Sequence, residues 1–380
     1  MLWIEAECIP TANPLTQKAS SAQCPRSPQR RPGSGYEKPA ARGTFPSKCW
    51  GVPGLVSVSY SLLSHSPVNT PPLSGLFDLQ VNGFGGIDFQ SESAPSALHA
   101  ACLRLLECGM ERILATFITD SPDALRGKLR AFEACRRQDP LLARCVVGYH
   151  LEGPYLSAET GYRGAHPAEW MKDPDWAEFE SFQEAGGGLV RLVTIAPERQ
   201  GSAAFMEKAV RSGVRVSLGH TNAGEADIDS AIASGATLCT HLGNGCPENL
   251  PRHHNVIQRL LARDELTACL IPDGIHLPPF VLRNLFRAKP PGKVILTTDA
   301  MSAAGAGPGR YRLGRVELEV GADQVVRMPG APNFAGSALR LDDGVRRAAR
   351  WLGIPEEEAR RMASEVPALA LGYPASTTTS

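Results

Sequence analysis

The chain has 380 residues, 43% of them hydrophobic and 21% charged, and its 39 basic residues balance its 39 acidic ones. This length suffices for one large hydrophobic core, and a net charge of zero leaves no basic field to attract nucleic acid or an anionic membrane. Small molecules are therefore the expected partners. The ten cysteines show no C-x-x-C spacing, which argues against a zinc ribbon or a compact disulfide framework and favours the reducing cytoplasm.

The first 72 residues differ in composition from the rest of the chain. They are rich in Pro, Ser, Arg and Gly and show no apolar periodicity, so we expect a disordered or atypical segment. The stretch GVPGLVSVSYSLL is too short to span a bilayer, and the first residues lack the basic start and apolar run of a signal peptide.

From residue 73 onward, eight short apolar runs alternate with segments that have helical periodicity. Unbroken apolar runs are typical of parallel strands that are covered on both faces, and eight such units match a (β/α)8 barrel over residues 73–373. A doubly wound open sheet is the alternative, but no Gly-rich dinucleotide turn supports it. The predicted strands cover residues 76–81, 112–119, 145–152, 190–197, 215–220, 236–242, 267–274 and 293–300.

The segments around these strands are predicted from their patterns of apolar and turn residues. Helices are expected at 94–109, 121–137, 202–213, 224–235 and 278–289, and two more follow the last strand, at 338–353 and 355–372. Residues 310–329 alternate between polar and apolar around a Gly-Ala-Asp turn, which predicts a β-hairpin insertion. Residues 374–380 form a polar tail.

Polar side chains stand at the ends of several predicted strands, where barrel enzymes carry their catalytic groups. One carboxylate and two imidazoles, from Glu152, His220 and His241, form a competent three-ligand site for zinc or a similar ion and leave one position for water. A metal lowers the pKa of such a water, and Asp299 could accept its proton. His276 could donate a hydrogen bond to a substrate carbonyl.

Each of these residues alone has a structural explanation. A single histidine at a strand end is more often a hydrogen-bonded structural residue, Asp299 could cap a turn, and Glu152 could pair with an arginine. Their occurrence together at corresponding ends of separate strands favours the metal site.

Eight short segments together resemble the N-acetylglucosamine-6-phosphate deacetylase family of the amidohydrolase superfamily over about residues 75–373. These are GLFDLQVNGFGG, HLEGP, GAHP, LGHTNA, THLGN, PDGIH, TTDA and FAGSAL. The resemblance implies hydrolysis of N-acetylglucosamine 6-phosphate to glucosamine 6-phosphate and acetate. It also implies one divalent metal per subunit, zinc foremost with iron, cobalt or manganese as alternatives, and Asp299 as proton acceptor and donor.

The resemblance also assigns the first strand and the substrate pocket. Gln80 and Asn82 stand where many amidohydrolases carry His-x-His, which indicates the single-metal branch. Arg252, eleven residues after His241, matches an arginine that binds the phosphate in the partner subunit's site and so implies a homodimer. The remaining substrate-binding positions are Ala165, His166, Asn244, Gly245, Asp273, Gly274, Ile275, Phe334, Ala335 and Gly336.

Three features depart from the family pattern. The residues LGNGCPENLPRHHN follow His241 in place of the sequence that is usual in the family. His253 and His254, which lie in this segment, are expected in a solvated loop. The small β-sandwich that accompanies the barrel in this family is expected to be reduced or missing. Two alternatives stay open: an amidohydrolase acting on an unphosphorylated N-acetyl sugar or an N-acyl amino acid, and a non-catalytic barrel with incomplete ends.

Overall fold

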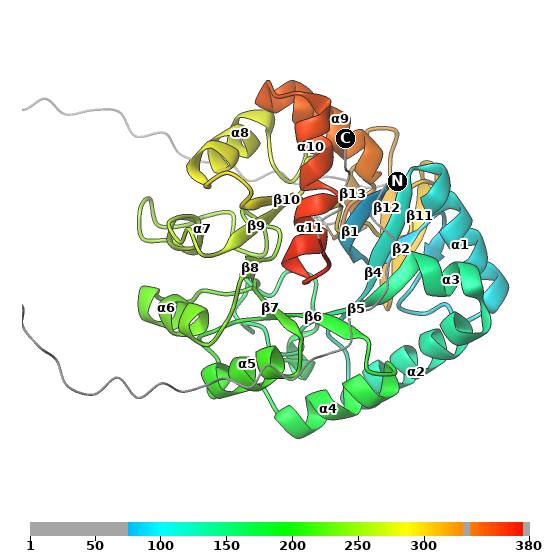
Figure 1. The fold of residues 1–380 in the computed structure, drawn as a ribbon, viewed down its shortest axis with the longest axis horizontal. Helices are drawn as coiled ribbons and strands as arrows, with labels where there is room; N and C mark the ends of the chain where they lie inside the picture. The colour runs from blue at the N-terminus through cyan, green and yellow to red at the C-terminus, as the bar shows by residue number, and fades with distance from the viewer. Residues whose placement is uncertain (1–74, 330–334, 375–380) are drawn as a thin grey trace, which may run out of the picture. The chain divides into compact units, whose positions relative to one another are not determined.

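The computed structural model describes residues 75–329 and 335–374, so the predicted segment 1–72 and nearly all of the polar tail lie outside the described residues. Eight strands form one parallel sheet in the order in which they occur along the chain, and the predicted (β/α)8 barrel is confirmed (Figure 1). They are β1 (Leu76–Val81), β4 (Met110–Ile118), β5 (Val146–Glu152), β6 (Val190–Ile195), β7 (Arg215–Leu218), β8 (Leu238–Cys239), β9 (Thr267–Leu270) and β10 (Val294–Leu296).

Helices surround this sheet, and the five predicted between strands are all present. The start of α2 shows two features typical of a helix N-terminus. Pro122 occupies its first turn, and the Ser121 side chain caps the helix by accepting a hydrogen bond from the Ala124 amide. No helix in the described part of the chain is both long and apolar enough to cross a membrane. The helices are α1 (Pro95–Glu107), α2 (Pro122–Gln138), α3 (Pro140–Cys145), α4 (Trp176–Ala185), α5 (Ser202–Arg211), α6 (Glu225–Ala233), α7 (Val256–Leu261) and α8 (Pro279–Ala288), with a short 3-10 turn at Ala168–Trp170.

The C-terminal part differs from prediction because the expected helix at 355–372 is two helices. After α9 (Leu341–Leu352), α10 (Glu356–Met362) ends at Met362, and a separate helix, α11 (Glu365–Ala370), begins at Glu365. Pro367 lacks the amide that would bond to the Ala363 carbonyl in a continuous helix. That carbonyl instead accepts a hydrogen bond of 2.8 Å from the Phe77 amide at the start of β1.

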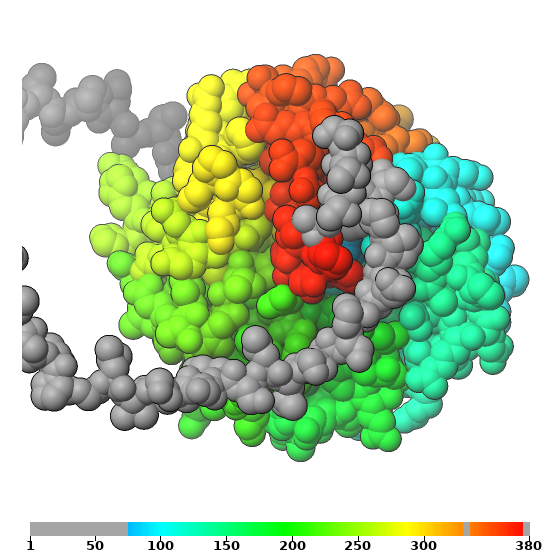
Figure 2. All heavy atoms as spheres, in the orientation of Figure 1, coloured from blue at the N-terminus to red at the C-terminus, as the bar shows by residue number. Residues whose placement is uncertain are grey.

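Helix α11 closes one end of the barrel. Figure 1 shows it across the ring of strands, and its atoms occupy the centre of the face drawn in Figure 2. Ala368 of α11 belongs to a buried cluster inside the barrel, and Tyr373 stacks edge-on against Phe77 with ring centroids 5.9 Å apart. The strands contribute Phe77, Leu79, Leu114, Leu192, Leu238, Cys269 and Ile295 to this cluster.

The predicted hairpin is a three-stranded antiparallel sheet, β11 (Gly309–Leu313), β12 (Val316–Val320) and β13 (Val326–Arg327). The tight turn lies at Gly314, whose positive φ of 58° suits a two-residue hairpin loop, and the Gly-Ala-Asp stretch connects β12 to β13. The apolar face of this sheet packs on Met301 and Ala335, next to the end of β10. A two-stranded sheet, β2 (Gly83–Phe84) and β3 (Ile87–Asp88), completes the described sheets, which include no β-sandwich.

Candidate metal centre and active site

The backbone turns sharply at three of the predicted site residues. His220, His241 and Asp299 follow β7, β8 and β10 and have φ values of 50°, 29° and 52°. Among the described non-glycine residues only Gln324 also has a positive φ. Such conformations are costly and concentrate at functional sites, where the surrounding structure holds them.

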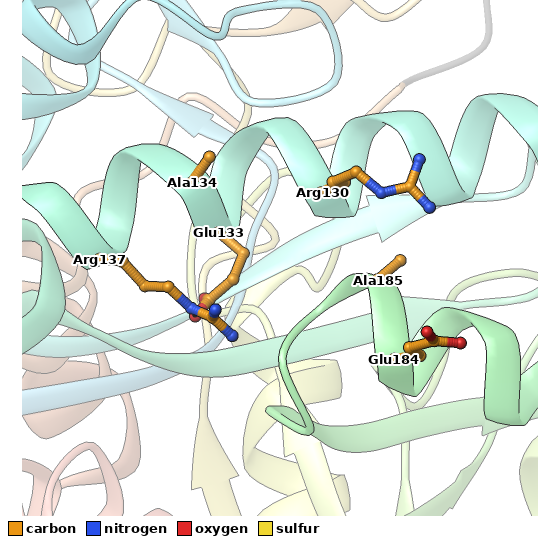
Figure 3. A pocket seen from close by; sticks show the side chains of 6 residues that line it. All are labelled: Arg130, Glu133, Ala134, Arg137, Glu184 and Ala185. Carbon is orange, nitrogen blue, oxygen red and sulfur yellow. The ribbon is translucent and has the colours of Figure 1, made fainter.

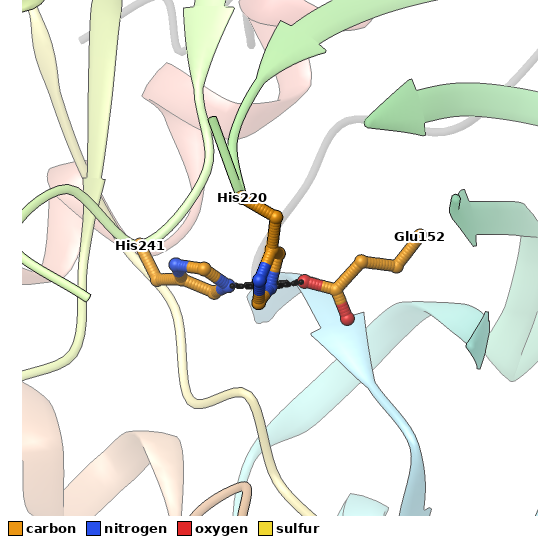
Figure 4. A group of neighbouring side chains, drawn as sticks. All are labelled: Glu152, His220 and His241. Carbon is orange, nitrogen blue, oxygen red and sulfur yellow. Dashed lines mark hydrogen bonds and ion pairs between the residues drawn. The ribbon is translucent and has the colours of Figure 1, made fainter. Parts of the chain in front are cut away.

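Glu152, His220 and His241 converge at one end of the barrel (Figure 4). The His220 Nε2 and His241 Nε2 atoms lie 3.2 and 3.0 Å from Glu152 Oε1, and they lie 3.1 Å from each other. Ligand atoms around a tetrahedral Zn²⁺ are about 3.3 Å apart, given bonds of about 2.0–2.1 Å. The three atoms therefore fit one small divalent cation.

The tautomer of His220 supports this fit. Its Nδ1 lies 2.8 Å from the Tyr162 carbonyl oxygen, which only accepts, so Nδ1 carries the proton and donates. With Nδ1 committed to Tyr162, Nε2 is the ring atom of His220 that can bind a metal. Gly245 lies against both rings: a Cβ there would come 3.0 Å from His220 Nδ1 and 3.1 Å from His241 Cε1.

The charge of Glu152 suits a metal ligand. Burial by itself would raise the pKa of this carboxyl, but the contacts with His220 and His241 outweigh it and hold the pKa well below its ordinary value. Glu152 is therefore an anion at neutral pH, as a ligand to a divalent cation must be.

Asp299 lies beside this cluster, and two amides connect it to β1. The Gln80 Nε2 group donates to both Glu152 Oε1 (3.0 Å) and Asp299 Oδ1 (2.9 Å), and the Asn82 Nδ2 group donates to Asp299 Oδ1 (2.8 Å). Burial, together with the negative charge of Glu152, raises the pKa of Asp299 to about 7. A carboxyl with this pKa can both accept and donate a proton near neutral pH.

The loop after β9 presents His276. The Asp273 carboxylate accepts from the Ile275 and His276 amides at 2.8 Å each, and its other oxygen lies 2.6 Å from His276 Nδ1. Burial lowers the pKa of His276, but Asp273 outweighs it, and the net shift is upward. The imidazolium is thereby favoured, and its Nε2–H is a donor. Asp273 orients His276 rather than offering its carboxylate to a ligand.

The loop after β5 brings His166 next to Glu152. Burial and then the neighbouring His220 lower the pKa of His166 to about 3, so its ring is neutral. The Thr119 amide donates to Nδ1 at 3.4 Å, and the Thr119 hydroxyl lies 3.0 Å from the same atom. Nε2 therefore carries the proton and faces Glu152 Oε2 at 3.7 Å. Gly153 makes this approach feasible, because a Cβ there would lie 2.1 Å from Thr119 Oγ1.

The other predicted substrate-binding residues fall into three places. Ala335 and Gly336 lie beside Asp299, since the next amide, from Ser337, donates to the Asp299 carbonyl at 2.9 Å. Arg252 is exposed on the loop before α7, together with His253 and His254. Phe334 lies outside the described residues. The remaining positions, Ala165, Asn244, Gly245, Gly274 and Ile275, are on the loops after β5, β8 and β9 that surround the cluster.

Hollows occur at two places in the described part of the chain, among others. One of about 310 Å³ adjoins the β9 loop and is lined by Asp273, Ile275, Gly305, Ala306, Gln324, Ala338, Leu339, Arg340, Asp343 and Arg347. The other, of about 230 Å³, lies between α2 and α4 on the outside of the barrel (Figure 3). Its lining includes Glu133, which is already paired with Arg137 at 2.7 Å, and none of the predicted site residues.

Three buried polar residues near the site are absent from the sequence prediction. Thr119 holds His166, and His150 lies two residues before Glu152 with Nε2 2.7 Å from Thr194 Oγ1. Asp78 is fully buried within β1. His150 and Asp78 each interrupt an apolar run that is otherwise suited to a barrel interior. This interruption is the sequence signal that could have identified them.

Known proteins are similar to this chain in sequence and in fold, although no family model matches it. The chain is 37% identical over 310 residues to the N-acetylglucosamine-6-phosphate deacetylase of Bos taurus. The aligned residues cover 78% of this chain and 74% of that relative. The chain is 31% identical over 296 residues to the N-acetylgalactosamine-6-phosphate deacetylase of Escherichia coli O157:H7, covering 78% and 76%.

A solved structure agrees with these relatives. A mutant N-acetyl-D-glucosamine-6-phosphate deacetylase from Mycobacterium smegmatis, in complex with N-acetyl-D-glucosamine-6-phosphate, superposes with a TM-score of 0.72 at 34% identity over 80% of this chain and 78% of that one. The sequence identity, its coverage of both chains and the shared barrel lead to one conclusion. The chain belongs to the N-acetylglucosamine-6-phosphate deacetylase family.

Proposed function

We propose that this chain, through the unit of residues 73–373, hydrolyses the acetamide of N-acetylglucosamine 6-phosphate to glucosamine 6-phosphate and acetate. The observation that carries the proposal is the convergence of Glu152, His220 and His241 beside Asp299. A one-metal site with an adjacent carboxyl that can take up and return a proton is suited to hydrolysing an unactivated amide.

The three ligands would hold one divalent ion, most simply zinc, which would supply Lewis acidity toward the amide carbonyl and toward water. Asp299 takes a proton from the attacking water as the water oxygen bonds to the carbonyl carbon. When the C–N bond breaks, Asp299 returns that proton to the leaving nitrogen. His276 donates from Nε2 to the carbonyl oxygen as negative charge develops there.

Neighbouring residues keep Asp299 and the substrate in place. Gln80 and Asn82 donate to the same Asp299 oxygen, which leaves its other oxygen for the transferred proton. His166, neutral with Nε2–H facing the cluster, serves as a further donor to the substrate. The remaining contacts to the sugar come from Ala165, Asn244, Gly245, Gly274, Ile275, Ala335 and Gly336.

The phosphate and the assembly belong to the same proposal. Arg252 offers a forked, charge-assisted contact to a phosphate, and it acts in the site of a second copy in a homodimer. The exposed position of Arg252 supports this role. The seven cysteines in the described residues are all free, which supports a reducing compartment such as the cytoplasm.

The test is acetate release by the zinc-loaded protein from N-acetylglucosamine 6-phosphate, N-acetylgalactosamine 6-phosphate and unphosphorylated N-acetylglucosamine. Glu152→Ala, which removes a metal ligand, gives the background, and Glu180→Ala on the exposed face of α4 is the matched control. We expect release from the glucosamine phosphate at least about 100-fold above the Glu152→Ala background. Release from the galactosamine phosphate alone would reassign the sugar. A folded, metal-loaded protein that releases acetate from none of them would refute the proposal.

A further inference from the structure

Asp78 is a carboxylate in the middle of β1 with no exposed surface. Burial of such a group is costly unless hydrogen bonds satisfy it. Its Oδ1 accepts from the Thr297 hydroxyl at 2.6 Å and from the Gln80 amide at 3.2 Å. Its Oδ2 accepts from the Thr298 hydroxyl at 2.6 Å and from the Thr298 amide at 3.2 Å. Both oxygens are therefore fully used within the protein.

These bonds span the seam of the barrel. β10 pairs with β9, and β1 pairs with β4, but β10 and β1 share no strand ladder. Beyond the end of β10 the chain meets β1 through a single bridge between Val81 and Ala300, where the Asn82 amide donates to the Ala300 carbonyl at 2.7 Å. The Asp78 carboxylate thus connects the two sides where backbone pairing is sparse.

The connection leads directly to Asp299. The Thr298 hydroxyl, which donates to Asp78, also accepts from the Ala300 amide at 3.0 Å. One hydroxyl group therefore ties together the residues on both sides of Asp299, whose φ of 52° needs such support. The Thr297 hydroxyl is bonded to the same carboxylate but makes no contact of this kind with the turn.

We propose that Asp78 is a positioning residue that fixes the backbone and carboxylate of Asp299 through the Thr298 hydroxyl. This inference rests on the proposed function, in which Asp299 carries the proton. Asp78 does not touch the substrate; it sets where Asp299 stands relative to Asn82 and Gln80.

The matched pair of variants Thr298→Val and Thr297→Val tests the proposal. Both threonines are fully buried, and each substitution replaces a hydroxyl bonded to Asp78 by a methyl group of similar size. A purely structural role predicts that both variants lose stability and that neither loses kcat selectively. A positioning role predicts that kcat falls by about 10–100-fold in Thr298→Val, with KM and bound metal unchanged, and by no more than about threefold in Thr297→Val. The acid limb of the pH profile of kcat/KM should move in Thr298→Val only.

A crystal structure of each variant gives a readout that does not depend on activity. The Asp299 Oδ1 to Asn82 Nδ2 contact, 2.8 Å in the wild type, should be lost in Thr298→Val and kept in Thr297→Val. If the wild type released no acetate, the proposed function would fail, and these structures would still decide on the positioning role. An unmoved Asp299 in both variants, or equal losses of kcat, would overturn it.

If Thr298→Val does not fold, a second pair of variants at the same position tests the proposal. Thr298→Ser keeps the hydroxyl and is expected to retain kcat within about threefold, whereas Thr298→Ala removes it and should lose kcat by about 10–100-fold. Equal kcat in the serine and alanine variants would contradict the role of the hydroxyl.

Discussion

At the scale of single residues, two carboxylates in this site have their pKa values moved in opposite directions. Burial and the charge of Glu152 raise the pKa of Asp299 to about 7. The contacts of Glu152 with His220 and His241 outweigh its burial and hold its pKa well below the ordinary value. Such a pair divides the chemistry: the permanently ionised group binds the cation and the other exchanges protons.

Metal binding should therefore release a proton from Asp299. A nearby cation favours the ionised carboxylate and lowers its pKa, so the protein without metal holds a proton on Asp299 at pH 6–7 that the metal-loaded protein has lost. Calorimetric titration of zinc in buffers of different ionisation enthalpy counts the protons. Near pH 7, Asp299→Asn should release about half a proton fewer than the wild type, and the difference should vanish above about pH 9. Equal release at pH 7 would contradict the raised pKa.

At the scale of elements, the strands were predictable because each is a short apolar run that ends at a polar residue. Parallel strands of a barrel present those ends together, so Glu152, His220 and His241 could be grouped before their distances of 3.0–3.2 Å were known. The helices α3, α4 and α7 were missed. α3 and α7 have only six residues each, too short for an apolar period to stand out.

Other features depend on contacts between residues that are distant in the sequence, and no local sequence pattern predicts such contacts. The break before α11 needs both Pro367 and the Phe77 amide, which lie far apart in the sequence. Asp78 and Thr119 act through residues 219 and 47 positions away, respectively, so their roles follow only from the closed barrel. The left-handed backbone at Asp299 likewise results from tertiary contacts rather than from local preference.

Helix α11 should contribute to stability through one face only. Ala368 is buried in the cluster inside the barrel, whereas Leu369, the next residue, is 47% exposed. Ala368→Asp places an unpaired carboxylate among apolar side chains and should lower the free energy of unfolding by about 2–4 kcal/mol. Leu369→Asp should change it by no more than about 0.5 kcal/mol. Urea unfolding measures both, and equal effects would show that α11 does not close the barrel as described.

At the scale of the whole molecule, the loop that carries Arg252 is anchored while its side chains face outward. The Asn255 side chain caps α7 by accepting from the Gln258 amide at 3.0 Å, and it donates to the Pro251 carbonyl at 2.9 Å. Residues 251–254 are all exposed. A fixed loop with an outward-facing arginine suits a contact to a second copy of the chain, in which each subunit completes the other's site.

Subunit complementation tests this arrangement. Asp299→Asn lacks the proposed proton acceptor but keeps Arg252, and Arg252→Ala has the opposite defect. In the proposed homodimer, each variant alone should therefore turn over the phosphorylated sugar poorly at low substrate concentration. Unfolding and refolding an equal mixture forms mixed dimers in which one of the two sites has both residues. Random pairing makes about half of the dimers mixed, so activity should reach about a quarter of the wild-type value. Activity equal to the mean of the two separate variants would place Arg252 in its own subunit's site or outside both sites.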